Sequence, residues 1–346
     1  MTRVLYIILY TAVLGFVAGF LPGSASSQTP HPMVQVEQFS LNTKTTQYQL
    51  ESAAADIIKK NHPWLRVTVI PGQTLMEGIG ISEKYPPEKR RNVSFITSNL
   101  DLNAMSLGMP PYTRKFSNLR MLNFWWLNQW SLATYDPNIK SPQDLKGKTI
   151  AVRPKGGTWD YFYTFLFKDC WGIQDSVKLA PMSPGNFSNS MLTGQAAASH
   201  WGAREVHQGK FALSPMEDET RLKRKLYFIS LTKEDFARGV KNSGGNPLSF
   251  GWMDVPAGAY GNGDPIQGPV GMISYSPGQG TWDIGDPEVG YAYVKTVNEN
   301  RDKFAEYSPA WKNAIGGPKM NPFPTLPAEY INAGALRYYK EQGWVK

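Results

Sequence analysis

A glycine-rich turn near the middle of the chain has residue types that bind anions. Residues 153–158 read Arg-Pro-Lys-Gly-Gly-Thr and follow a short apolar run. Two adjacent glycines let the backbone approach a ligand closely, and the N–H groups at the start of a following helix attract negative charge. The alternative is a tight turn in which the threonine caps a helix and both cations are solvated. The candidate ligand contacts here are Arg153, Lys155, Gly156, Gly157, Thr158 and, as an aromatic wall, Trp159.

Hydroxyl and amide side chains follow three predicted strands in the first third of the chain. In open parallel sheets, ligands bind beyond the carboxyl ends of the strands, where loops meet helix amino termini. Side chains of these loops are therefore candidates for polar ligand contacts, although N-capping explains the hydroxyl groups equally well. These candidates are Thr46, Tyr48, Gln73, Thr74, Thr97 and Ser98.

Motifs for catalysis are absent from the sequence. It has no G-x-S-x-G turn, no H-E-x-x-H pair and no G-x-x-x-x-G-K-[ST] phosphate loop. His200 and His207 lack a recognised ligand spacing and a cysteine partner. Cys170 follows Asp169 at a predicted helix end and is expected to be a buried apolar residue. We therefore expect no catalytic residue, no metal and no cofactor; an exported enzyme is the alternative, which turnover of a bound compound would support.

The composition excludes several classes of protein. The chain has 346 residues, of which 41% are hydrophobic and 18% charged, so it is long enough for two domains and too apolar to be disordered. Its formal net charge of +8 favours anionic partners without requiring nucleic acid. A single cysteine excludes an intramolecular disulfide framework and a multi-cysteine zinc site.

The amino terminus has the three parts of a secretory signal peptide. Arg3 precedes an uncharged run at residues 4–21, and a Pro-Gly pair with small residues follows as far as Ser27. Cleavage after Ala25 or Ser27 would lower the formal charge from +8 to +7. The alternative is an uncleaved anchor, since the apolar run reaches the short end of the length that spans a bilayer. Residues 1–27 are thus predicted to be a signal peptide, and 28–33 a polar linker.

Short β-type runs alternate with amphipathic helical patterns along the rest of the chain, which predicts α/β layers with mostly parallel strands. Helices are predicted from about 50 to 61, from the glycine turn to about 168, and over most of the chain from the Asp286-Pro287 pair to Trp344. Residues 241–268 are dense in Gly, Pro and Asn and are predicted to be irregular. The predicted strands are 34–42, 65–70, 93–96, two within 119–135, 148–153, 177–180, 196–201, 226–231 and 270–275.

Three segments occur in an order that is typical of one family. Residues 141–158 read SPQDLKGKTIAVRPKGGT, residues 255–264 read VPAGAYGNGD, and residues 332–343 read NAGALRYYKEQG. The first is shared by many periplasmic binding proteins, whereas VPAGAY and GALRYYKEQG in this order are more particular. Over nearly all of the chain after the predicted signal peptide, the sequence resembles the TAXI-type solute-binding proteins of TRAP transporters. This resemblance implies a type II-like two-lobed fold in which each lobe is a mostly parallel sheet flanked by helices, with a ligand cleft between the lobes.

The loops that would surround the ligand depart from the pattern of that family. Residues 43–48 stand where the family usually has a glycine-rich turn with Thr-Tyr-Tyr, and residues 71–74 replace its Thr-Gly-Gly-Ser. Residues 97–99 read Thr-Ser-Asn in place of Gln-Ser-Asp, and residues 155–158 read Lys-Gly-Gly-Thr in place of Gly-Ser-Gly-Thr. The scaffold resembles the family while the ligand shell is altered, so the glutamate and small-carboxylate ligands of the family do not transfer directly.

The resemblance also implies how the chain divides into two lobes and what the protein does. Lobe 1 would comprise residues 34–130 plus 270–346 and lobe 2 residues 131–269, with Trp201 and Gly202 at a position that faces the cleft. The implied function is that of a periplasmic monomer that captures a small organic anion, a carboxylate with or without an apolar or aromatic portion. It would close by hinge motion and deliver the anion to a TRAP-type membrane permease. The alternative is an ABC-type receptor of the sulfonate or thiamine-precursor kind.

Overall fold

The computed structural model describes residues 31–345, apart from 42, 44, 111, 155–157, 208–209, 214, 261–265 and 308–325. Residues 33–346 form one compact unit, and everything below concerns that unit. The predicted signal peptide, residues 1–27, lies outside the described residues. In the part of the chain that is described, no helix combines the length and the apolar character that a membrane span requires.

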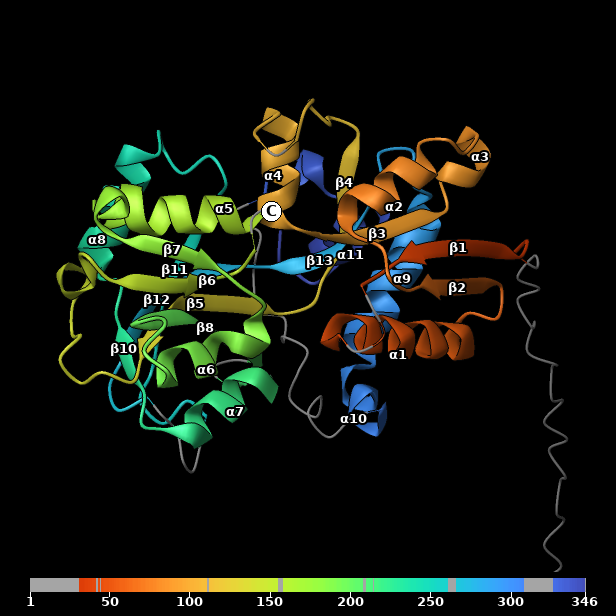
Figure 1. The fold of residues 1–346 in the computed structure, drawn as a ribbon. Coiled ribbons are helices and arrows are strands. Elements are labelled where there is room, and N and C mark those ends of the chain that lie inside the picture. Colours follow the sequence, from red (N-terminus) through yellow and green to blue (C-terminus); the bar gives the residue numbers. More distant parts are fainter. Residues whose placement is uncertain are drawn as a thin grey trace, which may run out of the picture. The chain divides into compact units, whose positions relative to one another are not determined.

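The first of two sheets combines four strands from the beginning of the unit with one strand from much later in the chain. Its strand order is β2-β1-β3-β13-β4, with β1 at Val34–Phe39, β2 at Leu65–Ile70, β3 at Val93–Ser98, β4 at Leu119–Phe124 and β13 at Pro277–Trp282. One face carries α2 (Leu75–Ser82), whose Gly78 lies against Phe39 of β1. The opposite face carries α1 (Thr46–Asn61) and α9 (Pro287–Glu299), which contact each other (Figure 1). The sheet is therefore covered on both faces.

The second sheet contains the middle of the chain. Its strand order is β11-β12-β5-β8-β6-β7, and β10 (Tyr227–Ile229) and β9 (Lys210–Ala212) pair with β5 and β8 off this path. The ordered strands are β5 (Leu127–Thr134), β6 (Thr149–Val152), β7 (Lys178–Pro181), β8 (Ala198–His207), β11 (Gly251–Val255) and β12 (Val270–Tyr275). The central strand β5 is buried from Asn128 to its end, which indicates helices or loops on both faces of the sheet.

The remaining helices begin at residues that cap their first turn. Ser98 accepts a hydrogen bond from the backbone N–H of Asp101, and Thr232 forms a reciprocal capping box with Asp235. These helices are α3 (Pro87–Arg90), α4 (Asn99–Leu107), α5 (Thr158–Tyr163) with a π-helical continuation at Thr164–Cys170, α6 (Phe187–Leu192), α7 (Pro215–Lys223), α8 (Lys233–Asn242), α10 (Phe304–Tyr307) and α11 (Ala333–Glu341).

Two neighbouring segments carry the chain between the sheets. β4 continues into β5 through Trp125 and Trp126, and β12 continues into β13 through Ser276. The two crossings run antiparallel, because the backbone N–H of Trp125 donates to the carbonyl of Pro277 at 3.0 Å. Asn99, at the start of α4, holds one crossing: its backbone N–H donates to the carbonyl of Ser276 at 3.1 Å, and its Oδ1 accepts from the Ser276 N–H at 2.8 Å.

These crossings correct the prediction of mostly parallel strands. Parallel pairs are confined to β1 with β2 and β3, and to β6 with β7 and β8. β13 is antiparallel to both of its neighbours, and β5 is antiparallel to β8, β10 and β12. Two strands that follow each other in one sheet become parallel when a crossover helix carries the chain back between them. β5 and β13 come directly from the other sheet without such a helix, and each is antiparallel to its neighbours. Both sheets are mixed, while the prediction of sheets flanked by helices is confirmed.

Most of the predicted strands and the helix beginning after Asp286 are present, but several elements were missed. β11 lies within the segment predicted to be irregular, and the elements that were not predicted include α2, α4, α6, α7 and α8. β13 was also missed, because its sequence Pro-Gly-Gln-Gly-Thr-Trp lacks an alternating pattern. Close packing explains these glycines: a Cβ on Gly278 would lie 2.0 Å from the carbonyl oxygen of Asn123. The predicted lobe borders stay a prediction, since the sheets belong to one compact unit.

Candidate ligand-binding site

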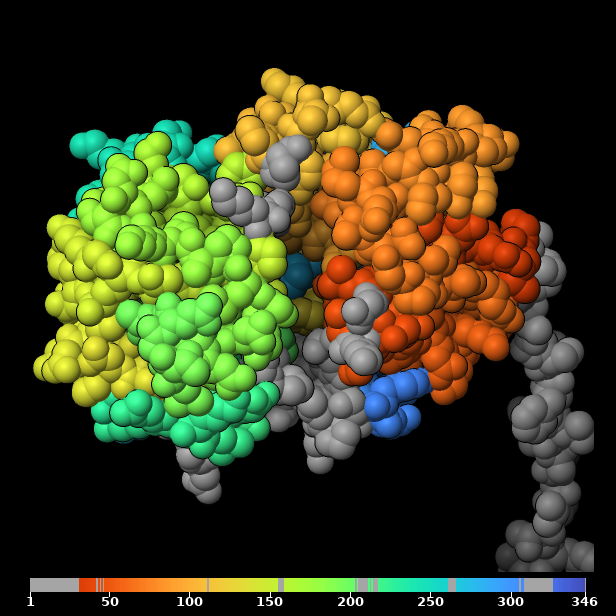
Figure 2. Space-filling view, in the orientation of Figure 1, coloured from red at the N-terminus to blue at the C-terminus, as the bar shows by residue number. Residues whose placement is uncertain are grey.

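A cavity of about 310 Å³ is lined by residues of both sheets and of the crossings between them. Figure 2 shows the surface hollowed between the orange segments of the first sheet region and the green segments of the second. Its lining residues include Gln47, Trp126, Asn128, Trp130, Arg153, Trp159, Gly202, Arg204, Glu217, Tyr275 and Pro277. A cavity with polar groups from two sheets is a place where ligands bind.

Strands β5 and β8 supply one wall of the cavity through a two-residue period. Trp126 precedes β5, and Asn128 and Trp130 follow on the same face of the strand. On β8, Gly202 lies opposite Trp130 and Arg204 lies opposite Asn128. The strand register therefore places the Trp130 indole over Gly202, and the Arg204 side chain beside that of Asn128, on one side of the sheet.

Two guanidinium groups and three indole rings line the cavity. Trp130 and Trp159 are stacked, with ring centroids 3.6 Å apart and planes inclined by 16°. The Arg153 guanidinium lies 4.2 Å from the centroid of Trp159, and that of Arg204 lies 5.8 Å from Trp126. None of the described residues accepts a hydrogen bond from the buried Nε of Arg153. With Glu217 as the acidic residue of the lining, the guanidinium groups leave the cavity net positive.

The polar groups between these rings form hydrogen bonds mainly with one another. The indole Nε1 of Trp126 donates to Asn128 Oδ1 at 2.7 Å, and Asn128 Nδ2 donates to the Tyr275 hydroxyl at 2.8 Å. Burial raises the pKa of Tyr275, so its phenol stays neutral. The groups that remain to attract a charged ligand are thus the guanidinium groups, which favour an anion.

A buried histidine supports the stacked indoles from behind. His200 is 2% exposed and lies edge-on to Trp130, with ring centroids 4.6 Å apart. Its Nδ1 is 3.3 Å from the hydroxyl of Tyr163, which accepts the backbone N–H of Arg153 at 3.0 Å. Burial, together with the charge of Arg153, holds the pKa of His200 well below its usual range. The imidazole is therefore neutral and adds no charge to the site.

The glycine opposite Trp130 makes a testable contribution to the stack. A Cβ on Gly202 would lie 2.9 Å from Cδ1 and Nε1 of Trp130. We expect Gly202→Ala to displace the indole, to lower the free energy of unfolding by about 1 to 3 kcal/mol, and to change the near-ultraviolet circular dichroism of the stacked rings. Gly268→Ala is the control, because its Cβ would meet no atom within 4 Å. Equal spectra for the two variants would contradict the assigned packing.

The structure brings only part of the predicted site together. Arg153, Trp159 and Gly202 line the cavity. Trp201 lies on the other face of β8, 2% exposed, and packs against Phe228. Thr46 is the first residue of α1, Lys155, Gly156 and Gly157 lie outside the described residues, and the side chain of Thr158 is not described.

The polar residues predicted after the early strands serve local structure. Thr74 forms a capping box with Glu77 at the start of α2, and Ser98 caps α4. Thr97 is buried at the end of β3, while Tyr48 and Gln73 are half-buried. None of these five residues is among the residues that line the cavity between the sheets. Their role in binding stays a prediction.

Several lining residues were not found by sequence reasoning. Trp126, Trp130, Arg204 and Gln47 are not among the candidates that the sequence indicated. A period of two was available as a signal: Trp126, Asn128 and Trp130 alternate along one strand, as do Gly202 and Arg204 along another. The polar and glycine positions within these apolar runs mark the face that lines a cavity rather than a core.

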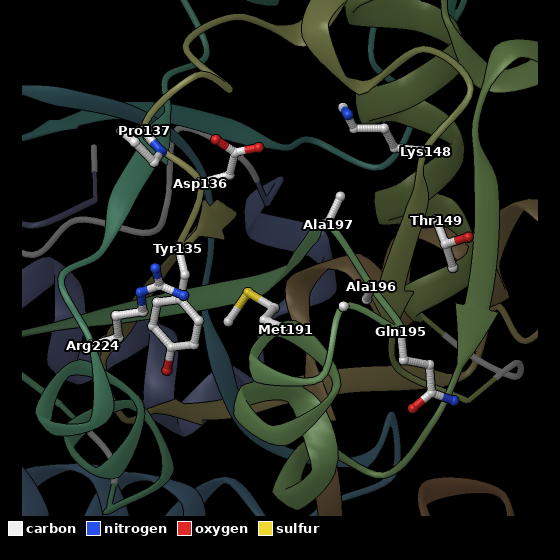
Figure 3. A pocket seen from close by; sticks show the side chains of 11 residues that line it. Tyr135, Asp136, Pro137, Lys148, Thr149, Met191, Gln195, Ala196, Ala197 and Arg224 are labelled. Atoms are coloured by element: carbon white, nitrogen blue, oxygen red, sulfur yellow. The ribbon is translucent and has the colours of Figure 1, made fainter.

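A second cavity, of about 470 Å³, lies at the other end of β5. Figure 3 shows the Arg224 guanidinium beside the Tyr135 ring, with Asp136 and Lys148 farther along the rim. All of its lining residues come from the second sheet and its loops. It therefore lacks the contribution from both sheets that distinguishes the first cavity. In the described part of the chain, no group of three or more His, Cys, Asp or Glu side chains is placed to hold a metal ion.

Comparisons with known proteins give a family model that matches this chain and solved structures with a similar fold. A family model described as NMT1-like matches residues 87–343. The fold is similar to that of XAC2383 from Xanthomonas citri, solved with bound ATP, at 9% identity and a TM-score of 0.51 over 89% of this chain and 98% of that one. This likeness concerns the fold alone and confirms the expected α/β architecture. Among curated protein sequences, none matches significantly.

Two further solved structures are similar at slightly lower scores. A TctC solute-binding protein from Polaromonas is 11% identical, with a TM-score of 0.49 over 82% of this chain and 91% of that one. MatC from Rhodopseudomonas palustris, solved with bound malate, is 9% identical, with a TM-score of 0.49 over 90% and 98% of the two chains.

Proposed function

The chain belongs to the NMT1-like family, and on that premise we propose that it is an extracytoplasmic solute-binding protein and not an enzyme. It captures a small organic anion in the cavity between the two sheets. The ligand carries a carboxylate, with or without an apolar or aromatic portion. The predicted signal peptide supports a periplasmic location, and the protein acts as a monomer.

One observation carries this proposal: Arg153, directly after β6, and Arg204 of β8 line the same cavity, beside three indole rings. A guanidinium binds a carboxylate through two parallel hydrogen bonds, and the Nε of Arg153 has no acceptor among the described residues. The indoles provide apolar faces for the remainder of the ligand. A cavity of about 310 Å³ suits a molecule of small-metabolite size.

The partner of the loaded protein would be a membrane permease. The TAXI-like segments support a TRAP-type permease, reached after the two sheets close on the ligand by hinge motion. The second candidate is an ABC-type receptor, the alternative that the sequence left open. A neighbouring gene for a large multi-span permease supports the first partner, whereas a neighbouring ATPase with a phosphate-binding loop supports the second.

A thermal-shift screen tests the proposed ligand class. The panel comprises succinate, malate, glutamate, benzoate and taurine, with ethanolamine and glucose as cationic and neutral controls. A compound present at 100 times its Kd stabilises by about 2.7 kcal/mol, which raises the Tm by a few degrees in a protein of this size. We expect at least one carboxylate to do so. A shift with a control compound and with no anion would refute the anion site.

A further inference from the structure

A buried carboxyl group lies one helical turn behind the cavity. Glu51 of α1 is 0% exposed, and it follows Gln47, which lines the cavity, by four residues along the same helix. Residues at this spacing share one face of a helix. Glu51 and Gln47 therefore face the first sheet together, with the glutamine nearer to the cavity.

The surroundings of this carboxyl are polar but carry no compensating cation. Gln279 of β13 donates from Nε2 to Glu51 Oε1. Gln38 of β1, Ser40 directly after it and Gln47 of α1 also act on the carboxyl, and all are neutral. The titratable group that faces it is the Tyr293 phenol of α9, which is itself buried and donates to Gln38 Oε1 at 3.1 Å.

The hydrogen bonds of this network are incomplete on both sides. Among the described residues, Glu51 Oε2 and Gln279 Oε1 lack a well-aligned donor, and Gln38 Nε2 and Ser40 Oγ lack a well-aligned acceptor. A buried carboxylate without a cation is costly, whereas a protonated carboxyl donates a hydrogen bond to an acceptor that lacks one. Desolvation accordingly raises the pKa of Glu51 from 4.5 to about 7.

Gln47 joins this network to the ligand cavity. Its Nε2 donates to the carbonyl of Gly278 at 3.3 Å, a long hydrogen bond, and Gly278 follows the cavity-lining Pro277. When Glu51 loses its proton, the charged Oε2 becomes a stronger acceptor than a backbone carbonyl. It then competes with Gly278 for the amide of Gln47, and the wall of the cavity changes with it.

We propose that Glu51 is a positioning residue that sets the orientation of Gln47 in the cavity and thereby makes anion binding depend on the protonation of Glu51. This inference rests on the proposed function, because it concerns the same cavity. The neutral carboxyl leaves Gln47 on the carbonyl of Gly278. The charged form withdraws the amide of Gln47 from the cavity wall, so affinity for the anion falls as the carboxyl ionises.

The test measures binding of benzoate and of succinate to the purified protein by isothermal titration calorimetry at about pH 6 and about pH 8. We expect the wild type to bind the better of these two anions at least about fivefold more tightly at the lower pH, and to take up protons on binding near neutrality. In Glu51→Gln, which keeps the shape and neutrality of the protonated acid, both effects disappear. The exposed Glu234→Gln is the matched control and should behave as the wild type.

Gln47→Ala separates positioning from stability. The folded-state pKa of Glu51 is raised, so the contribution of this group to the free energy of unfolding is fully present below pH 4.5 and is lost as the pH rises through about 7. In Gln47→Ala this contribution to the pH dependence of the Tm should remain, because Glu51 is intact, while the pH dependence of anion binding is lost. In Glu51→Gln the contribution and the pH dependence of binding are both lost.

The outcomes distinguish this inference from the function on which it rests. Anion binding that is equally tight at both pH values, or that keeps its pH dependence in Glu51→Gln or Gln47→Ala, overturns the role of Glu51 and leaves the receptor function intact. Failure of both anions to bind at either pH overturns the inference. If no other anion of the thermal-shift panel binds either, the proposed function fails as well.

Discussion

Replacing Arg153 by alanine is expected to lower the affinity of the protein for carboxylates by about thirtyfold or more. Loss of one partner from a desolvated charge pair costs about 2 to 5 kcal/mol, and each 1.4 kcal/mol is a factor of ten. Arg153 is the better placed of the two guanidinium groups, because it lies over Trp159 and its Nε has no acceptor among the described residues. Calorimetric titration with the tightest carboxylate of the thermal-shift panel measures the loss.

Two further variants separate the contact from the charge. Arg337→Ala removes the same charge from α11, where Arg337 pairs with Glu288 on the surface, and should leave the affinity unchanged. Arg153→Lys keeps the charge without the planar fork and should recover part of the affinity. If Arg153→Ala and Arg337→Ala bind equally well, Arg153 does not contact the ligand.

Replacing Gly334 by alanine is expected to destabilise the protein by about 3 kcal/mol or more. Gly334 lies in the first turn of α11, and a Cβ there would stand 1.7 Å from the carbonyl oxygen of Pro287 and 2.7 Å from the backbone nitrogen of Tyr291. Both are backbone atoms of α9, so the clash can be relieved only if the two helices separate. Overpacking of this kind costs about 1 to 3 kcal/mol when side chains give way, and more when backbone must move.

The matched control is another helical glycine, Gly80 in α2. A Cβ at Gly80 meets no atom within 4 Å, so alanine should stabilise the helix by up to about 1 kcal/mol. Urea unfolding followed by circular dichroism gives both values. Opposite signs for the two substitutions are expected; a stable Gly334→Ala protein would contradict the close approach of α9 and α11.

Several residues of two motifs that carried the resemblance have structural roles, which explains why these residues indicated the fold and not the ligand. Asn332 opens the NAGALRYYKEQG segment and caps α11, and Gly334 permits its contact with α9. Asp144, in the SPQDLKGKTIAV segment, accepts hydrogen bonds from the backbone N–H groups of Lys140 and Ser141. Such residues specify turns and helix ends wherever they occur, so they identify an architecture from sequence alone.

Three residues of the candidate site could be predicted from the sequence: Arg153 directly after β6, Trp159 after the glycine turn, and Gly202 of β8. The polar residues chosen after the early strands were explained equally well by helix capping, and the structure places Thr74 and Ser98 in that role. Trp130 and Arg204 depend on which face of a strand meets the other sheet. That information is long-range, and the antiparallel entry of β5 and β13 could not be read from local patterns.

The paired crossings between the sheets also fix where the molecule can bend. Ser276 is clamped by both of its backbone groups to Asn99, so a rotation of one sheet against the other cannot pivot at that residue. Tyr275, the residue before Ser276, lines the cavity, and its hydroxyl accepts a hydrogen bond from Asn128 of β5. If the sheets close on a ligand by the proposed hinge motion, the bend would fall next to this pair, and a ligand in the cavity would contact the residues at the bend.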